Sequence, residues 1–111
     1  MDGRGGAIFP PMEPRRETES TQRLHGLRVA ITRGTTGLGL ALVREVLGRG
    51  AAVAFVARDR ERVERVAREH PGAYGIVGDV AKKDDVYPIA LQITGRLGGL
   101  DVLVYMRQRM W

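Results

Sequence analysis

Residues 27–42 read Leu27-Arg28-Val29-Ala30-Ile31-Thr32-Arg33-Gly34-Thr35-Thr36-Gly37-Leu38-Gly39-Leu40-Ala41-Leu42. The stretch begins as a short apolar strand, breaks at three glycines and continues as an amphipathic helix. The start of a helix leaves backbone N–H groups without partners and carries partial positive charge. Glycines also lack the β-carbons that would keep a diphosphate away from the backbone. The stretch therefore predicts a nucleotide diphosphate site.

The composition narrows the classes of function. The chain has 111 residues, no cysteine and two histidines, so we expect one domain without disulfides and without a metal site. No apolar run approaches the roughly 20 residues of a membrane span. Residues 1–27 also lack the apolar centre of a signal peptide. We therefore expect a cytoplasmic protein with no membrane partner.

The net charge of +5 is compatible with nucleic-acid binding, but the placement of the charges argues against it. Arginines alternate with glutamates at helical spacing over residues 58–69. Such alternation is typical of a solvated helix face. We expect no nucleic-acid partner.

Strands alternate with helices along the chain. Strands are predicted over 28–32, 51–57, 73–77 and 100–105, and helices over 38–49, 60–69 and 84–97. The first helix is expected to bury Leu38, Ala41, Leu42 and Val46, and Asp59 is expected to cap the second. We expect a disordered leader over 1–26, a folded domain over 27–105 and a tail over 106–111.

This alternation predicts an α/β fold, a doubly wound three-layer sandwich around a parallel sheet of four strands. The rule for such sheets gives the strand order 3-2-1-4, with a nucleotide at the carboxyl ends of strands one and four. Strand four then forms an exposed apolar edge, which favours pairing with a second chain.

Several motifs resemble those of the short-chain dehydrogenase/reductase family. Thr32-Arg33 followed by Gly34, Gly37 and Gly39 has the spacing of the family's TGxxxGxG motif. Arg58 directly follows the second strand, Asp79-Val80 follows the third, and the run 99–104 is similar to the approach to the family's Asn-Asn-Ala-Gly motif. The resemblance covers about residues 26–104 and implies a partial Rossmann-type dinucleotide-binding domain.

The resemblance also implies which residues bind the cofactor. A guanidinium at position 58 can pair with the 2′-phosphate of NADP, so NADP is expected ahead of NAD. Asp79 and Val80 are expected at the adenine. The full expected set is Thr32, Gly34, Thr35, Thr36, Gly37, Leu38, Gly39, Arg58, Asp79 and Val80. Each residue also has a competing interpretation without a ligand. The glycine run is then a plain turn, Arg58 is a solvated residue of the first helical turn, and Asp79 is a turn or cap residue.

Three departures from the family's pattern limit the expected chemistry. Arg33 replaces the first glycine, where it either adds a phosphate contact or clashes with the adenosine ribose, and the sequence favours the clash. A positive φ there costs a non-glycine residue about 1 kcal/mol or more. Tyr105-Met106-Arg107-Gln108 replaces Asn-Asn-Ala-Gly, and no match to the family's catalytic Ser or Tyr-x-x-x-Lys follows. We assign no catalytic residue and no metal ligand.

These features predict the NAD(P)-binding portion of a short-chain dehydrogenase/reductase-like oxidoreductase that is catalytically incompetent as an isolated chain. One alternative is a non-catalytic interaction module that self-associates through the strand-four edge. Another is a nonfunctional, truncated gene product.

Overall fold

The computed structural model describes residues 24–106, in which strands and helices strictly alternate. The strands are β1 (Arg28–Thr32), β2 (Ala52–Ala57), β3 (Ala73–Val77) and β4 (Val102–Val104), and the helices are α2 (Gly37–Gly48), α3 (Arg60–Glu69) and α4 (Lys83–Leu97). The expected leader lies outside the described residues up to residue 23, and the expected tail lies outside them from residue 107. β4 is shorter than the predicted strand 100–105.

The sheet is parallel throughout, and its order β3-β2-β1-β4 confirms the predicted topology. β1 lies inside the sheet, where Val29 is in register with Val53 of β2 and Val102 of β4. The four central residues of β2, Val53 to Val56, are all buried. A continuous apolar run is what a parallel strand needs when both faces of the sheet are covered.

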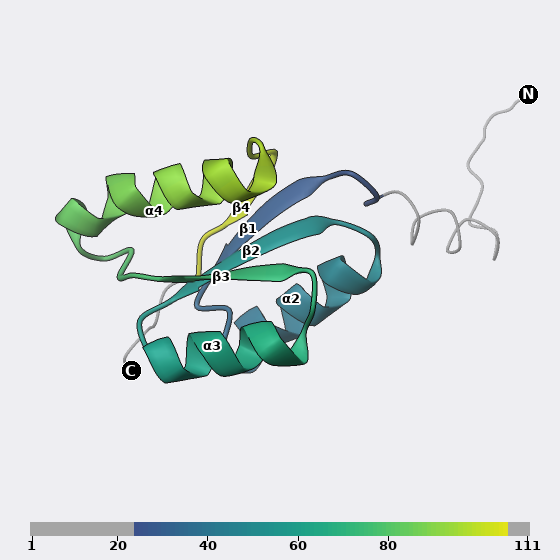
Figure 1. Ribbon diagram of the computed structural model, residues 1–111, viewed down its shortest axis with the longest axis horizontal. Coiled ribbons are helices and arrows are strands. Elements are labelled where there is room, and N and C mark those ends of the chain that lie inside the picture. The colour runs from purple at the N-terminus through teal and green to yellow at the C-terminus, as the bar shows by residue number, and fades with distance from the viewer. Residues whose placement is uncertain (1–23, 107–111) are drawn as a thin grey trace, which may run out of the picture.

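The helices cover the two faces of the sheet unequally (Figure 1). On one face, α2 and α3 contribute Val43, Val63 and Val66 to a core that includes Ile31 and Phe55. On the other face, α4 packs Ile89 and Ile93 against Ala54, Val56 and Ile76. The three layers are those of the predicted sandwich. Among the described helices, none is long and apolar enough to cross a bilayer.

The buried face of α2 differs from the predicted one. Leu38 is 66% exposed and Ala41 is also exposed, whereas Val43 is fully buried. Gly39 sets the buried face of α2, because it packs against the carbonyl of Arg33. The residues three and four positions after Gly39 then point at the sheet. The prediction that Leu38 and Ala41 are buried is therefore wrong.

The start of α3 agrees with the sequence prediction. Asp59 accepts hydrogen bonds from the backbone N–H groups of Glu61 and Arg62 through its Oδ1 atom, at 3.0 and 3.4 Å. This N-cap fixes where the chain turns after β2 and thereby places Arg58 at the carboxyl end of the sheet.

Candidate functional site

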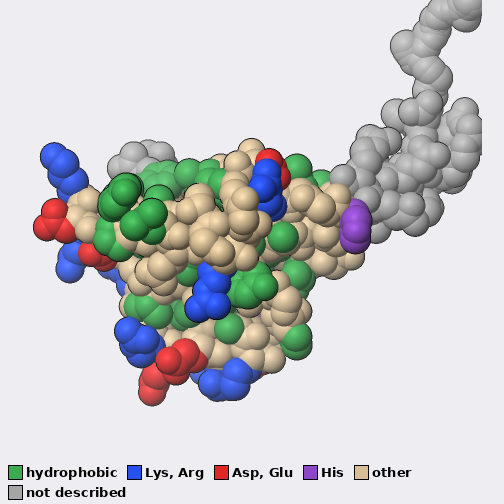
Figure 2. All heavy atoms as spheres, turned by 45° about the horizontal axis from the view of Figure 1, so that its top comes forward, with side chains coloured by type: hydrophobic (Ala, Val, Ile, Leu, Met, Phe, Trp, Pro, Cys, Tyr) green, Lys and Arg blue, Asp and Glu red, His purple; other side chains and the backbone are tan. Residues whose placement is uncertain are grey.

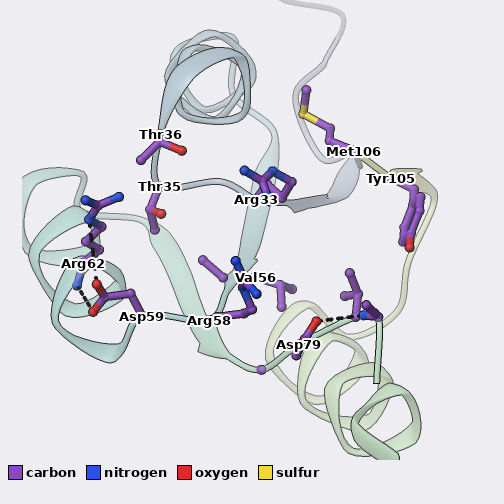
Figure 3. A pocket seen from close by; sticks show the side chains of 14 residues that line it. Arg33, Thr35, Thr36, Val56, Arg58, Asp59, Arg62, Asp79, Tyr105 and Met106 are labelled. Carbon is purple, nitrogen blue, oxygen red and sulfur yellow. Dashed lines mark hydrogen bonds and ion pairs between the residues drawn. The ribbon is translucent and has the colours of Figure 1, made fainter. Parts of the chain in front are cut away.

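A cavity of about 670 Å³ opens at the carboxyl ends of the strands (Figure 3). Four chain segments contribute to it: the loop after β1, the end of β2, the turn after β3 and the residues after β4. Its lining consists of Arg33, Thr35, Thr36, Val56, Ala57, Arg58, Asp59, Arg62, Gly78, Asp79, Val80, Ala81, Tyr105 and Met106. This is the end of a doubly wound sheet at which ligands bind.

The loop between β1 and α2 is anchored on both sides of its first residue, Arg33. The buried hydroxyl of Thr32 accepts a hydrogen bond from the Met106 N–H at 2.6 Å and donates to the Met106 carbonyl at 3.1 Å. The Gly34 N–H donates to the Val56 carbonyl at 3.3 Å. Arg33, between these two anchors, has a φ of 57° and is half-buried.

Two glycines of the loop are required by close packing. A β-carbon at Gly39 would overlap the carbonyl oxygen of Arg33, and one at Gly34 would press against the side chain of Phe55. The start of α2 therefore lies directly against the loop, in a way that only glycine permits. Arg33, Thr35 and Thr36 of this loop line the cavity.

The first turn of α2 lacks any compensating negative charge. Its N-cap, Thr36, makes no side-chain capping hydrogen bond, and the turn contains no acidic residue. By contrast, Asp59 and Glu61 stand at the start of α3, and Asp84 and Asp85 in the first turn of α4. An uncapped helix start attracts an anion because its N–H groups and its dipole both favour negative charge.

Arginines dominate the side of the cavity near β2. Arg62 lies 3.8 Å from Asp59, measured from Nε to Oδ2. Among residues 24–106, neither Arg33 nor Arg58 forms an ion pair. Two guanidinium groups therefore line the cavity without a carboxylate partner from the described residues, which favours an anionic ligand.

The turn after β3 is held by the carboxylate of Asp79. Its Oδ1 atom accepts a hydrogen bond from the Ala81 N–H at 2.9 Å, and the Asp79 N–H donates to Oδ2 of Asp85 at 3.0 Å. Asp79 thus shapes the turn and also lines the cavity, together with its neighbour Val80. The turn role and the binding role foreseen for this residue are compatible.

The structure brings half of the expected binding residues to the cavity. Those that line it are Thr35, Thr36, Arg58, Asp79 and Val80. The other five lie outside its lining, and each has its own structural role: Thr32, Gly34, Gly37, Leu38 and Gly39. The hydroxyl of Thr32 forms hydrogen bonds with the backbone of Met106. Gly34 and Gly39 allow close packing of the loop and α2. Gly37 begins α2 with a φ of 54°, and Leu38 faces solvent.

Sequence reasoning missed the lining residues after β4. Tyr105, which is absent from the expected binding set, is 51% exposed and lines the cavity beside Met106. Tyr105 follows β4, two strands away from β2, which precedes Arg58, and this position follows from the pairing of β4 with β1. No local motif marks it, and the strand order was the signal that could have found it.

Comparison with known proteins identifies the family. The family model described as short chain dehydrogenase matches residues 28–106, which include every strand and helix described above. This chain belongs to the short-chain dehydrogenase family. The match confirms the resemblance seen in the glycine motif and in the residues after β2 and β3.

Two named dehydrogenases match about three quarters of this chain. Cis-2,3-dihydrobiphenyl-2,3-diol dehydrogenase of Paraburkholderia xenovorans is 37% identical over 83 residues, which are 74% of this chain and 30% of the relative. L-fucose dehydrogenase of Bos taurus is 34% identical over 82 residues, again 74% of this chain and 30% of the relative. The chain thus spans about 30% of the length of these two relatives.

Solved structures share the fold. A double mutant of a Serratia marcescens short-chain dehydrogenase/reductase has a TM-score of 0.73 at 28% identity, covering 79% of this chain and 38% of that one. The 3-ketoacyl-(acyl-carrier-protein) reductase of Brucella melitensis, complexed with NADH, has a TM-score of 0.69 at 31% identity, covering 72% and 33%. The fold and the family together indicate that this chain is a domain of the dinucleotide-binding type.

Proposed function

We propose that residues 28–106 bind NADP(H) and hold its adenosine half in the cavity at the carboxyl end of the sheet. The observation that carries this proposal is the position of Arg58. Its guanidinium lines the same cavity as Thr35 and Thr36 at the uncapped start of α2. A cation and a helix N-terminus at one cavity suit a ligand that carries two separate phosphate groups.

The residues present fit the adenosine half of the cofactor. The start of α2 would take the diphosphate, because Gly39 and Gly34 allow close approach of the loop. Arg58 would pair with the 2′-phosphate, and Asp79 with Val80 would lie at the adenine. A volume of about 670 Å³ is within the range of small-molecule sites. When bound, the cofactor supplies the hydride of a redox reaction.

The preference between the two cofactors is the finer part of the proposal. The Brucella melitensis relative was solved with NADH, so family membership alone does not select the phosphorylated form. Here the residue after Arg58 is acidic, but Asp59 is engaged in capping α3 and in the contact with Arg62. Arg58, which has no carboxylate partner within residues 24–106, supports NADP(H).

Isothermal titration calorimetry of the 111-residue chain with NADPH and NADH tests the proposal. We expect tighter binding of NADPH, and we expect Arg58→Ala to weaken NADPH binding roughly tenfold or more, as loss of a charged hydrogen bond does. Arg65→Ala is the matched control, because Arg65 is an exposed arginine of α3 outside the cavity lining. Equal effects of the two substitutions on NADPH binding would contradict the assignment.

We further propose that the isolated chain carries out no hydride transfer. The family's proton-donating Tyr and its Lys have no counterpart in the 111 residues. The expected result is no NADPH oxidation above the buffer blank with a panel of aldehydes and ketones. Turnover with any of them would overturn this part.

The edge of the sheet favours a second candidate function, self-association. Within the described residues β4 pairs with β1 alone, and its Val102 and Leu103 are 38% and 53% exposed. An apolar edge strand with free N–H and C=O groups is a template for another strand. The proposed occupant is the β4 edge of a second copy of this chain.

A further inference from the structure

Arg33 is the cavity residue that departs from the family's glycine motif, because TGxxxGxG has glycine at this position. Its φ of 57° is the left-handed conformation that favours glycine, and a larger residue there costs roughly 1 kcal/mol or more. The backbone on both sides of Arg33 is held by hydrogen bonds, from the Met106 N–H to the Thr32 hydroxyl and from the Gly34 N–H to the Val56 carbonyl.

The side chain of Arg33 forms part of the cavity wall. Figure 3 shows it over the same end of the sheet as Arg58, whose guanidinium extends toward the loop that carries Arg33. The volume of about 670 Å³ is present with the Arg33 side chain in place. Arg33 thus lines the space that a ligand would occupy and does not fill it.

Within the described part of the chain, the carboxylates near this pair leave both guanidinium groups available to a ligand. Asp59 uses its Oδ1 atom to cap α3 and lies near Arg62, while Oδ1 of Asp79 holds the turn at Ala81. Neither carboxylate forms an ion pair with Arg33 or Arg58 within residues 24–106. Two like charges at one cavity repel each other, and a bound dianion removes that repulsion.

We propose that Arg33 is a second phosphate-binding residue, and that Arg33 and Arg58 together hold the 2′-phosphate of NADP(H). The inference rests on the proposed function, because it assigns a further residue to the same site. It reverses the sequence-based expectation that Arg33 clashes with the ribose. A pair of guanidiniums offers a phosphate two bidentate contacts from two sides, where Arg58 alone offers one.

The test compares Arg33→Gly and Arg33→Asn with the unchanged chain by calorimetric titration. Glycine restores the family's residue, and asparagine accepts a left-handed φ without carrying charge. We expect both substitutions to weaken NADPH binding about tenfold or more and to change NADH binding little. Adenosine 2′,5′-bisphosphate should lose affinity as NADPH does, and adenosine 5′-monophosphate should not.

Two further measurements separate phosphate binding from a structural effect. Thermal unfolding should show Arg33→Gly at least as stable as the unchanged chain, because the substitution relieves the left-handed strain. In a double-mutant cycle, Arg33→Gly should cost less NADPH affinity in the Arg58→Ala background, since both residues bind one group. Additive losses would place the two arginines on different phosphates and would contradict the proposal.

The remaining outcomes distinguish this inference from the proposed function. NADPH binding that is unchanged or tighter in both Arg33 variants makes Arg33 a bystander or an obstacle, and it overturns the inference while leaving the cofactor site intact. Equal weakening of NADPH and NADH also overturns it, because the 2′-phosphate is then not involved. Failure of the unchanged chain and of Arg33→Gly to bind NADPH overturns both proposals.

Discussion

The guanidinium of Arg28 and the carboxylate of Asp101 join the first residue of β1 to the segment that leads into β4. Arg28 Nε lies 3.0 Å from Asp101 Oδ2, Nη2 lies 3.0 Å from Oδ1, and the Arg28 N–H donates to Oδ2 at 2.9 Å. In return the Asp101 N–H donates to the Arg28 carbonyl at 2.9 Å. Figure 2 shows the outer surface of the molecule around the helices, where charged side chains are scattered between apolar ones. The Arg28–Asp101 pair differs from such single charges because it is bidentate and fixes strand pairing.

This pair predicts how stability depends on pH. The hydrogen bonds from Arg28 lower the pKa of Asp101 from 3.8 to about 2. A lowered pKa in the folded state means that the stabilisation is complete above about pH 4 and is lost as the pH falls toward 2. Urea unfolding of the unchanged chain and of Asp101→Asn should therefore differ at pH 7 and converge near pH 2. A difference that persists at pH 2 would show that the substitution acts through packing.

Gly39→Ala should destabilise the chain and abolish cofactor binding. The new β-carbon would overlap the Arg33 carbonyl, so α2 or the loop must shift, at roughly 1–3 kcal/mol. Gly48→Ala is the control, because Gly48 has open space around its β-carbon position at the end of the same helix. It should raise stability by roughly 0.5–1 kcal/mol. Urea unfolding and NADPH titration of both variants check these effects, and equal stability of the two would count against the packing argument.

Thr32→Val should cost roughly 1–3 kcal/mol although it preserves the shape of a side chain that is 2% exposed. The Met106 N–H would lose its acceptor, and the Met106 carbonyl would lose a donor. Thr32→Ser retains the hydroxyl and should cost less. Hydrogen exchange at the Met106 amide reports the bond directly. Protection that survives Thr32→Val would mean that another acceptor replaces the hydroxyl.

Leu103→Lys should suppress self-association through the β4 edge. Lysine on an edge strand opposes the approach of a second strand, and Leu103 is 53% exposed. Sedimentation velocity over a range of concentrations should show a monomer–dimer equilibrium for the unchanged chain and a monomer for the variant. NADPH affinity should not change, because Leu103 is outside the cavity lining. A strictly monomeric unchanged chain would exclude the edge-pairing candidate.

Local sequence patterns were sufficient to predict the order of the elements and the topology. The continuous apolar run of β2 indicates a strand covered on both faces, and the cap residue Asp59 marks the start of α3. Both signals depend on neighbours in the chain, and the order 3-2-1-4 then follows from general rules for parallel sheets. The positions of Arg58 and Asp79 at one end of the sheet follow in turn, because Arg58 directly follows β2 and Asp79 comes two residues after the end of β3.

The sequence by itself thus determined the family, the strand order and five of the residues at the cavity, because each depends on short segments and on general rules for parallel sheets. Only the tertiary structure decided which face of α2 is buried, that Thr32 bonds to Met106, and that Tyr105 lies at the cavity. Thr32 and Met106 are 74 residues apart in the chain. Such contacts depend on the register between β1 and β4 and on the closeness of α2 to the loop, which no local pattern specifies.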